Sequence, residues 1–178
     1  MTTTPRKLKT LAAAMVLGTT LLGAHSMTHA APQNPTAPVS MVQQWDKIFP
    51  QSNQVTHRKV SFKNRYGITL VGDLYIPKNA SGKLPAIAVS GPFGAVKEQS
   101  SGLYAQTLAE RGFITLAFDP SYTGESGGQP RHVPSPEINT EDFSAALDYL
   151  GSLGNVNRDN IGSPGICGWG GFALNAAV

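Results

Sequence analysis

Apolar and polar residues alternate in two neighbouring segments of the chain, residues 59–64 and residues 68–76. A period of two is typical of strands that bury one face. The turn-forming run Asn64-Arg65-Tyr66-Gly67 lies between the two segments. The pattern therefore predicts an antiparallel hairpin.

The pattern changes after the hairpin to short apolar runs that alternate with segments of helical spacing. Three segments are predicted to be strands buried on both faces: residues 85–90, 113–118 and 160–166. Three are predicted to be helices: residues 101–111, 139–150 and 172–178. Alternating strands and helices predict an α/β fold with a mostly parallel sheet. Ligands of such sheets bind at the carboxyl ends of the strands, where the glycine-rich loops of this chain also fall.

The first thirty residues have the organisation of a secretion signal. Basic residues precede an uncharged apolar stretch over residues 10–24, and small residues lead up to Ala30. We expect cleavage after Ala30 and export to the periplasm or the medium. The apolar stretch is short for the alternative, a membrane anchor. The remainder divides into a polar arm over residues 31–57 and a domain over residues 58–178.

Removal of this signal changes the charge balance. The chain has 14 Lys and Arg and 11 Asp and Glu, and three of the basic residues precede Ala30. The mature chain is therefore formally neutral. We expect neither nucleic acid nor, after signal removal, a membrane as partner.

The turn over Gly165–Gly171 follows a predicted strand and opens a predicted helix, which is the setting of a nucleophile elbow. The spacing from the strand puts Cys167, the one cysteine, at the nucleophile position. The spacing back from the helix fits the small-residue pattern better, but puts Trp169 there, and an indole cannot attack. The sequence leaves both registers open, and a lone cysteine can equally be a buried apolar residue.

Two backbone N–H groups are candidates for an oxyanion hole: that of Gly168, which follows Cys167, and that of Phe93, in the loop after an earlier strand. Pro92 has no N–H to offer. A literal Gly-x-Ser-x-Gly string at Ser126 is a weaker nucleophile candidate, because Pro130 prevents a helix directly behind it.

Other polar residues near these loops receive structural interpretations. Asp119 is expected to organise a loop, and Lys97 with Glu98 to be solvated. His57 and His132 both precede Cys167 and are expected at the surface, whereas the histidine of an elbow enzyme follows the nucleophile.

Four sequence runs together resemble the α/β-hydrolases related to dienelactone hydrolases and to the Xaa-Pro peptidase-like group. They are Val89–Gly94 with Lys97-Glu98-Gln99, Leu108–Phe113, Asp119–Ser126 and Gly165–Gly171. The resemblance covers residues 58–177 and implies the N-terminal half of the domain, ending just after the elbow. It implies hydrolysis of an ester, a lactone or a related acyl bond of a small molecule, without metal or cofactor. Dienelactone hydrolases use a cysteine nucleophile, which favours Cys167. The alternative is a non-catalytic binding module or an inactive truncated product.

Overall fold

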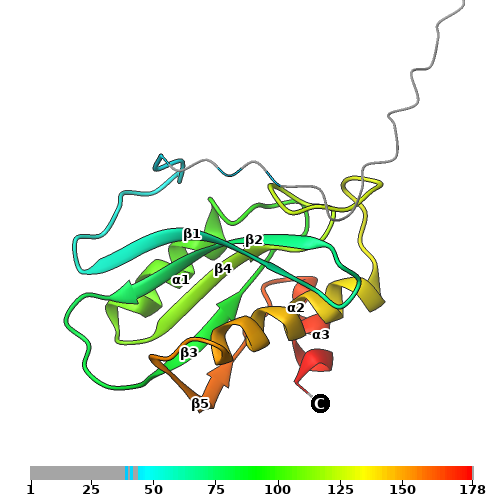
Figure 1. Cartoon of the computed structure of the whole chain (residues 1–178). Helices are drawn as coiled ribbons and strands as arrows, with labels where there is room; N and C mark the ends of the chain where they lie inside the picture. Colours follow the sequence, from blue (N-terminus) through cyan, green and yellow to red (C-terminus); the bar gives the residue numbers. More distant parts are fainter. Residues whose placement is uncertain (1–38, 40, 42–43, 178) are drawn as a thin grey trace, which may run out of the picture. The chain divides into compact units, whose positions relative to one another are not determined.

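The computed structural model describes residues 39, 41 and 44–177, so the predicted signal over residues 1–30 lies outside the described residues. The described part forms a five-stranded sheet in the order β1-β2-β4-β3-β5 (Figure 1). The strands are β1 (Val55–Lys63), β2 (Thr69–Pro77), β3 (Leu84–Val89), β4 (Ile114–Asp119) and β5 (Val156–Gly162). β1 and β2 form the predicted antiparallel hairpin, and β3 pairs in parallel with β4 and β5. This confirms the α/β fold class.

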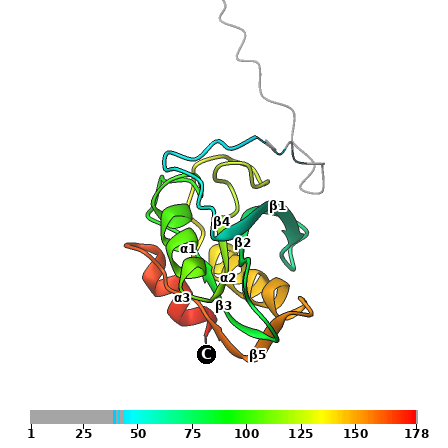
Figure 2. The same ribbon diagram turned by 90° about the vertical axis from the view of Figure 1, so that its left-hand side faces the viewer.

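Helices cover both faces of the sheet. They are α1 (Ser100–Glu110), α2 (Pro136–Gly151) and α3 (Trp169–Ala176). Figures 1 and 2 show α1 and α2 on opposite sides of the sheet, and α3 packs beside α2. Because neighbouring strand residues point to opposite faces, Ala88 joins the core under α2 and α3, and Val89 joins the core under α1.

Four predicted elements have boundaries that are wrong by three residues or more. β1 begins at Val55 rather than at residue 59, and α3 begins at Trp169 rather than at residue 172. β5 covers Val156–Gly162 rather than residues 160–166, and its side chains are mostly exposed. It pairs with β3, and its two apolar side chains, those of Val156 and Ile161, pack into the core. Helix α2 begins at Pro136, three residues earlier than predicted, because Ser135 caps it and proline is favourable in the first turn.

The segment before β1 packs on the sheet face that carries α1. Trp45 lies against that core, its ring contacts the rings of Phe49 and His57, and its indole N–H donates to the Phe49 carbonyl at 2.9 Å. Part of the predicted polar arm is therefore an ordered layer over the hairpin.

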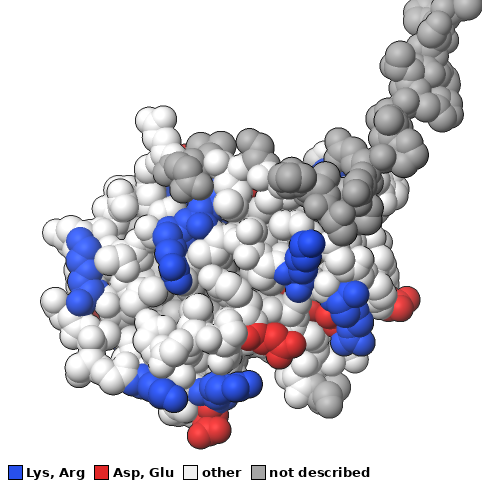
Figure 3. All heavy atoms as spheres, viewed as in Figure 1, with Lys and Arg blue, Asp and Glu red and all other residues white. Residues whose placement is uncertain are grey.

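Charged side chains of both signs are interspersed on the face that Figure 3 shows. None of the described helices combines the length and the hydropathy that a bilayer span requires.

Candidate active site

A sharp corner between β5 and α3 carries Cys167. A bridge between Ser90 and Gly165 extends the β3–β5 pairing past Gly162, and the Ile166 N–H donates to the Ser90 carbonyl at 3.2 Å. Cys167 then adopts a φ of 56°, and α3 begins two residues later. A positive φ is uncommon for a residue with a side chain and concentrates at functional sites.

The two candidate registers have different structural outcomes. Cys167 is exposed at the corner. Trp169 is the first residue of α3, only 3 % exposed, with its ring 5.2 Å from Phe172 and 6.3 Å from Phe143. The strained backbone thus presents the thiol, and the indole belongs to the core.

The corner packs tightly on the loop that follows β3. A β-carbon at Gly91, whose φ is 123°, would overlap the Ile166 carbonyl and the Trp169 ring. A β-carbon at Gly165 would overlap the backbone of Trp169. Only glycine fits at these two positions, so the close approach of the two segments depends on them.

Phe93 and Gly168 face each other across this contact. A β-carbon at Gly168 would overlap the Phe93 ring, so the ring lies directly over the residue after Cys167. Within the part of the chain that the structure describes, neither the Phe93 N–H nor the Gly168 N–H donates a hydrogen bond. The structure thus places the Phe93 ring against the residue that follows Cys167, and neither N–H group is used in a hydrogen bond within the described residues.

Asp119, at the end of β4, holds the loop after β3 in place. Its carboxylate accepts the Lys97 backbone N–H at 2.8 Å, the Lys97 ammonium at 2.9 Å and the Glu125 N–H at 3.0 Å. Lys97 and Asp119 are both fully buried. The prediction of a solvated Lys97 is wrong, because its ammonium is surrounded by carboxylates; Asp119 organises loops as expected.

This pair is one end of a buried ionic chain that reaches the segment before β1. The Glu125 carboxylate lies 2.6 Å from the Lys97 ammonium and 2.7 Å from that of Lys59. Lys59 also pairs with Asp46 at 2.9 Å. Burial alone would lower the pKa of Lys97, but the charge of Asp119 and hydrogen bonds to acidic neighbours outweigh it and raise that pKa.

The far end of this ionic chain, at the segment before β1, contains Asp46 and Asp73. Lys47 lies 3.0 Å from Asp73, which also accepts a hydrogen bond from His57 at 2.7 Å. Partial burial raises the pKa of Asp46, but the hydrogen bonds and charges of Lys47 and Lys59 outweigh it and lower that pKa to about 2. His57 is thus a structural residue.

Ser126, the serine of the literal Gly-x-Ser-x-Gly string, is 2 % exposed. Its hydroxyl donates to the Asp119 carbonyl at 2.6 Å and accepts the Val71 N–H at 2.9 Å. Both hydrogen bonds connect the loop to strands, so Ser126 is structural in this fold.

A hollow of about 280 Å³ opens beside the corner. It is lined by Phe93, Gly94, Thr123, His132, Val133, Pro134 and Trp169. These residues come from the loops after β3 and β4 and from the start of α3, at the carboxyl ends of the strands. Sequence reasoning missed this hollow, because residues 132–134 carry no motif.

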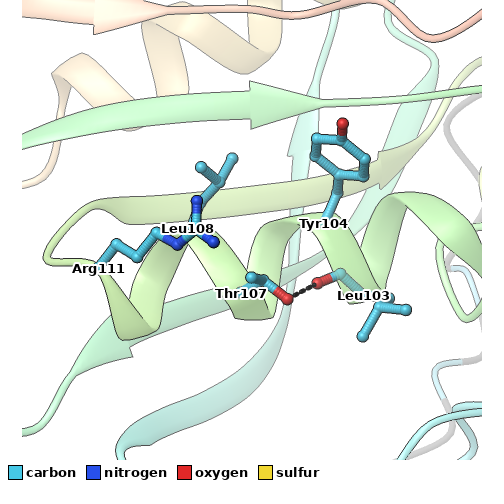
Figure 4. Close-up of a pocket in the computed structure, with 5 residues that line it drawn as sticks. All are labelled: Leu103, Tyr104, Thr107, Leu108 and Arg111. Carbon is cyan, nitrogen blue, oxygen red and sulfur yellow. Dashed lines mark hydrogen bonds between the residues drawn. The ribbon is translucent and has the colours of Figure 1, made fainter.

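Another hollow, of about 300 Å³, lies over the outer face of α1. Figure 4 shows that its lining comes from α1, including Leu103 and Tyr104, and from Arg111, the C-cap residue of that helix. The hydroxyl groups of the lining are those of Tyr104 and Thr107, and the Thr107 hydroxyl donates to the Leu103 carbonyl at 2.8 Å. Within the described residues, no group of three or more His, Cys, Asp or Glu side chains could hold a metal ion.

Comparisons with known proteins agree with this fold. A 71 % identical relative, the uncharacterized protein PA2218 of Pseudomonas aeruginosa, aligns over 79 % of this chain and 38 % of its own length, and a crystal structure of PA2218 superposes with a TM-score of 0.76, covering 79 % of this chain and 44 % of that one. A thiohydrolase of Aspergillus aculeatus, aneE, is 33 % identical over 71 % of this chain and 39 % of its own.

The solved α/β hydrolase GrgF from Penicillium sp. sh18 is 30 % identical and superposes with a TM-score of 0.62 over 68 % of this chain and 41 % of that one. The chain thus spans about two fifths of the length of the curated relatives it matches. Residues 66–178, more than half of the sequence, match the family described as X-Pro dipeptidyl-peptidase (S15 family). With its fold, its corner at Cys167 and these relatives, the chain belongs to the S15 family of α/β hydrolases.

Proposed function

We propose that Cys167 is the nucleophile of an acyl hydrolase that cleaves an ester, a lactone or a related acyl bond of a small molecule. The observation that carries this proposal is the positive φ of an exposed cysteine between a strand and a helix. This backbone is the one a nucleophile elbow requires. The name of the thiohydrolase relative supports thioesters as a further acyl donor.

The chemistry assigned to this chain is acylation. The Cys167 thiolate forms a bond to the acyl carbonyl carbon, and the carbonyl electron pair moves to the oxygen. The N–H groups of Phe93 and Gly168, which form no hydrogen bond within the described residues, would donate to that oxyanion. Collapse of the intermediate expels the alkoxide or thiolate leaving group and leaves an acyl thioester on Cys167, which water later cleaves.

Complete turnover needs a general base. In α/β hydrolases the acid and the histidine follow the nucleophile in chain order, and no histidine follows Cys167 in the 178 residues. We therefore assign acylation to this chain's own residues. Repeated turnover is proposed for a polypeptide that also carries the acid and the histidine.

The release of p-nitrophenolate from p-nitrophenyl acetate by the 178-residue chain tests acylation. We expect a burst of about one equivalent per chain, which Cys167→Ala abolishes and Ser126→Ala preserves. Release that is unchanged in Cys167→Ala would remove Cys167 from the mechanism.

A second candidate is a non-catalytic binding module on a hydrolase scaffold. The Cys167 thiol is exposed, and no hydrogen bond within the described residues joins it to a base, which favours this alternative. A chain that binds an acyl compound reversibly but never forms an acyl thioester would support this alternative over the hydrolase.

We also propose that the protein is exported, on the basis of the signal-like organisation of residues 1–30. Intact mass of protein recovered from the periplasm or medium should correspond to a chain that begins at Ala31. Recovery of the uncleaved chain from the cytosol would contradict export.

A further inference from the structure

The hollow beside Cys167 is built mainly from apolar surface. Trp169 is almost fully buried at its base, whereas the rings and side chains at its rim remain open, with Phe93 47 % and Val133 36 % exposed. Exposed large apolar groups that gather around a hollow mark a binding site more often than isolated ones do.

The lining also defines the charge of the group that fits. No Asp, Glu, Lys or Arg side chain lines the hollow. The polar side-chain groups of its lining residues are the Thr123 hydroxyl, the His132 imidazole and the Trp169 indole N–H, and none forms a hydrogen bond within the described residues. A neutral, largely apolar group fits this surface, because no Asp, Glu, Lys or Arg lines the hollow to offset the hydration that a charged group would lose.

The volume of the hollow limits the size of the group that fits in it. In another protein, an apolar cavity of about 150 Å³ binds benzene. The hollow here has about 280 Å³. It therefore has room for one aromatic ring with a short linker, and it lies below the usual size of sites for larger ligands, which begin near about 300 Å³.

The position of the hollow connects it to the reacting atoms. The Phe93 ring lines the hollow and also lies against Gly168, the residue after Cys167, and its centroid is 4.4 Å from that of the Trp169 ring. Trp169 follows Cys167 by two residues. A substituent on a carbonyl carbon bound at Cys167 thus has this hollow beside it.

We propose that the hollow is the acyl subsite, and that it takes a neutral acyl group that ends in a single aromatic ring on a short linker. The assignment deepens the proposed function and rests on it. Aromatic rings favour such a surface because offset and edge-to-face contacts with Phe93 and Trp169 add to the burial of apolar area.

Reversible binding to the 178-residue chain with Cys167→Ala tests the subsite without any chemistry. The probes are 3-phenylpropanamide and propanamide, which differ by the ring alone. Calorimetry should show saturable binding of 3-phenylpropanamide that is roughly tenfold or more tighter than that of propanamide, as expected for burial of a phenyl group. Equal or undetectable binding of both would overturn the proposal.

Two variants locate the binding. Val133→Asp adds a charge at the exposed rim. It should weaken the binding of 3-phenylpropanamide by roughly tenfold or more, because the charge lies beside the apolar ring of the ligand. Leu103→Asp, on the α1 hollow, should change nothing. The reverse pattern would place the ring on α1 and overturn the assignment.

The outcomes separate the subsite from the proposed function. Ring-selective binding that Val133→Asp weakens, in a chain that never becomes acylated at Cys167, would keep the subsite and reject the hydrolase. Acylation at Cys167 without any preference for the ring would keep the hydrolase and reject the subsite.

Discussion

Lys97 and Asp119 are joined twice, once through the Lys97 backbone N–H at 2.8 Å and once through its ammonium at 2.9 Å. Both side chains are fully buried. The double contact fixes the loop that carries Phe93 to the end of β4. The loop proposed to supply an oxyanion donor is therefore positioned by a buried ion pair, and its geometry depends on that pair.

Replacement of Lys97 by methionine should destabilise the fold strongly. Asp119 would remain buried without its cation, and removal of one partner from a buried pair costs about 3–5 kcal/mol. Urea unfolding of Lys97→Met against the wild type measures this, with exposed Lys78→Met as the control. A loss below about 1 kcal/mol, the range of surface ion pairs, would contradict the account.

Acid should loosen the segment before β1. The pKa of Asp46 is lowered to about 2 from the model-compound value of 3.8. A carboxyl group with a lowered pKa stabilises the folded state above its ordinary pKa, and this contribution is lost as the pH falls towards its folded pKa. Trp45 emission should therefore change between about pH 4 and about pH 2. If the acid-induced change in Trp45 emission is unaltered in Asp46→Asn, then groups other than Asp46 cause that change.

Gly168→Ala should disturb the site, because the added methyl group would overlap the Phe93 ring. The burst of p-nitrophenolate should become slower by about tenfold or more, since a misplacement near 1 Å can cost about a hundredfold. Gly171→Ala is the matched control, because a β-carbon there meets nothing within 4 Å. Because Gly171 lies within α3, its replacement by alanine should raise the free energy of unfolding by about 0.5–1 kcal/mol. Equal burst rates for the two variants would count against the assigned oxyanion site.

Ser126→Ala should lower stability and leave acylation intact. Its hydroxyl makes two buried hydrogen bonds, to the Asp119 carbonyl and from the Val71 N–H. Loss of a buried partner costs about 1–3 kcal/mol. Thermal unfolding and the burst amplitude, measured on the same preparation, separate the two effects. A lost burst in a folded variant would return Ser126 to the list of nucleophiles.

The order of strands and helices could be predicted from the sequence because each element has a local periodicity. The hairpin alternates, and the strands at 85–90 and 113–118 are apolar runs that the sheet buries on both faces. The prediction failed at β5, where the polar run Asn157–Asp159 separates the two apolar residues that pair with β3, Val156 and Ile161. Periodicity carries no signal for such an edge strand.

The site was predictable only in part. Glycine spacing located the corner, but the sequence could not decide between Cys167 and Trp169, because the choice depends on a backbone angle and on which side chain the core accepts. The burial of Lys97 was missed for a related reason. Its partners Asp119 and Glu125 lie 22 and 28 residues away, and pairing over that distance leaves no local pattern.

The position of the transferred acetyl group on the chain tests most directly whether Cys167 is the nucleophile. The 178-residue chain, treated with p-nitrophenyl acetate and quenched in acid, is digested and mapped by mass spectrometry. The account predicts one acetyl group per chain, carried by the peptide that contains Cys167 and absent from Cys167→Ala. Acetylation at Ser126 or on lysines, with the Cys167 thiol still free to react with iodoacetamide, would contradict it.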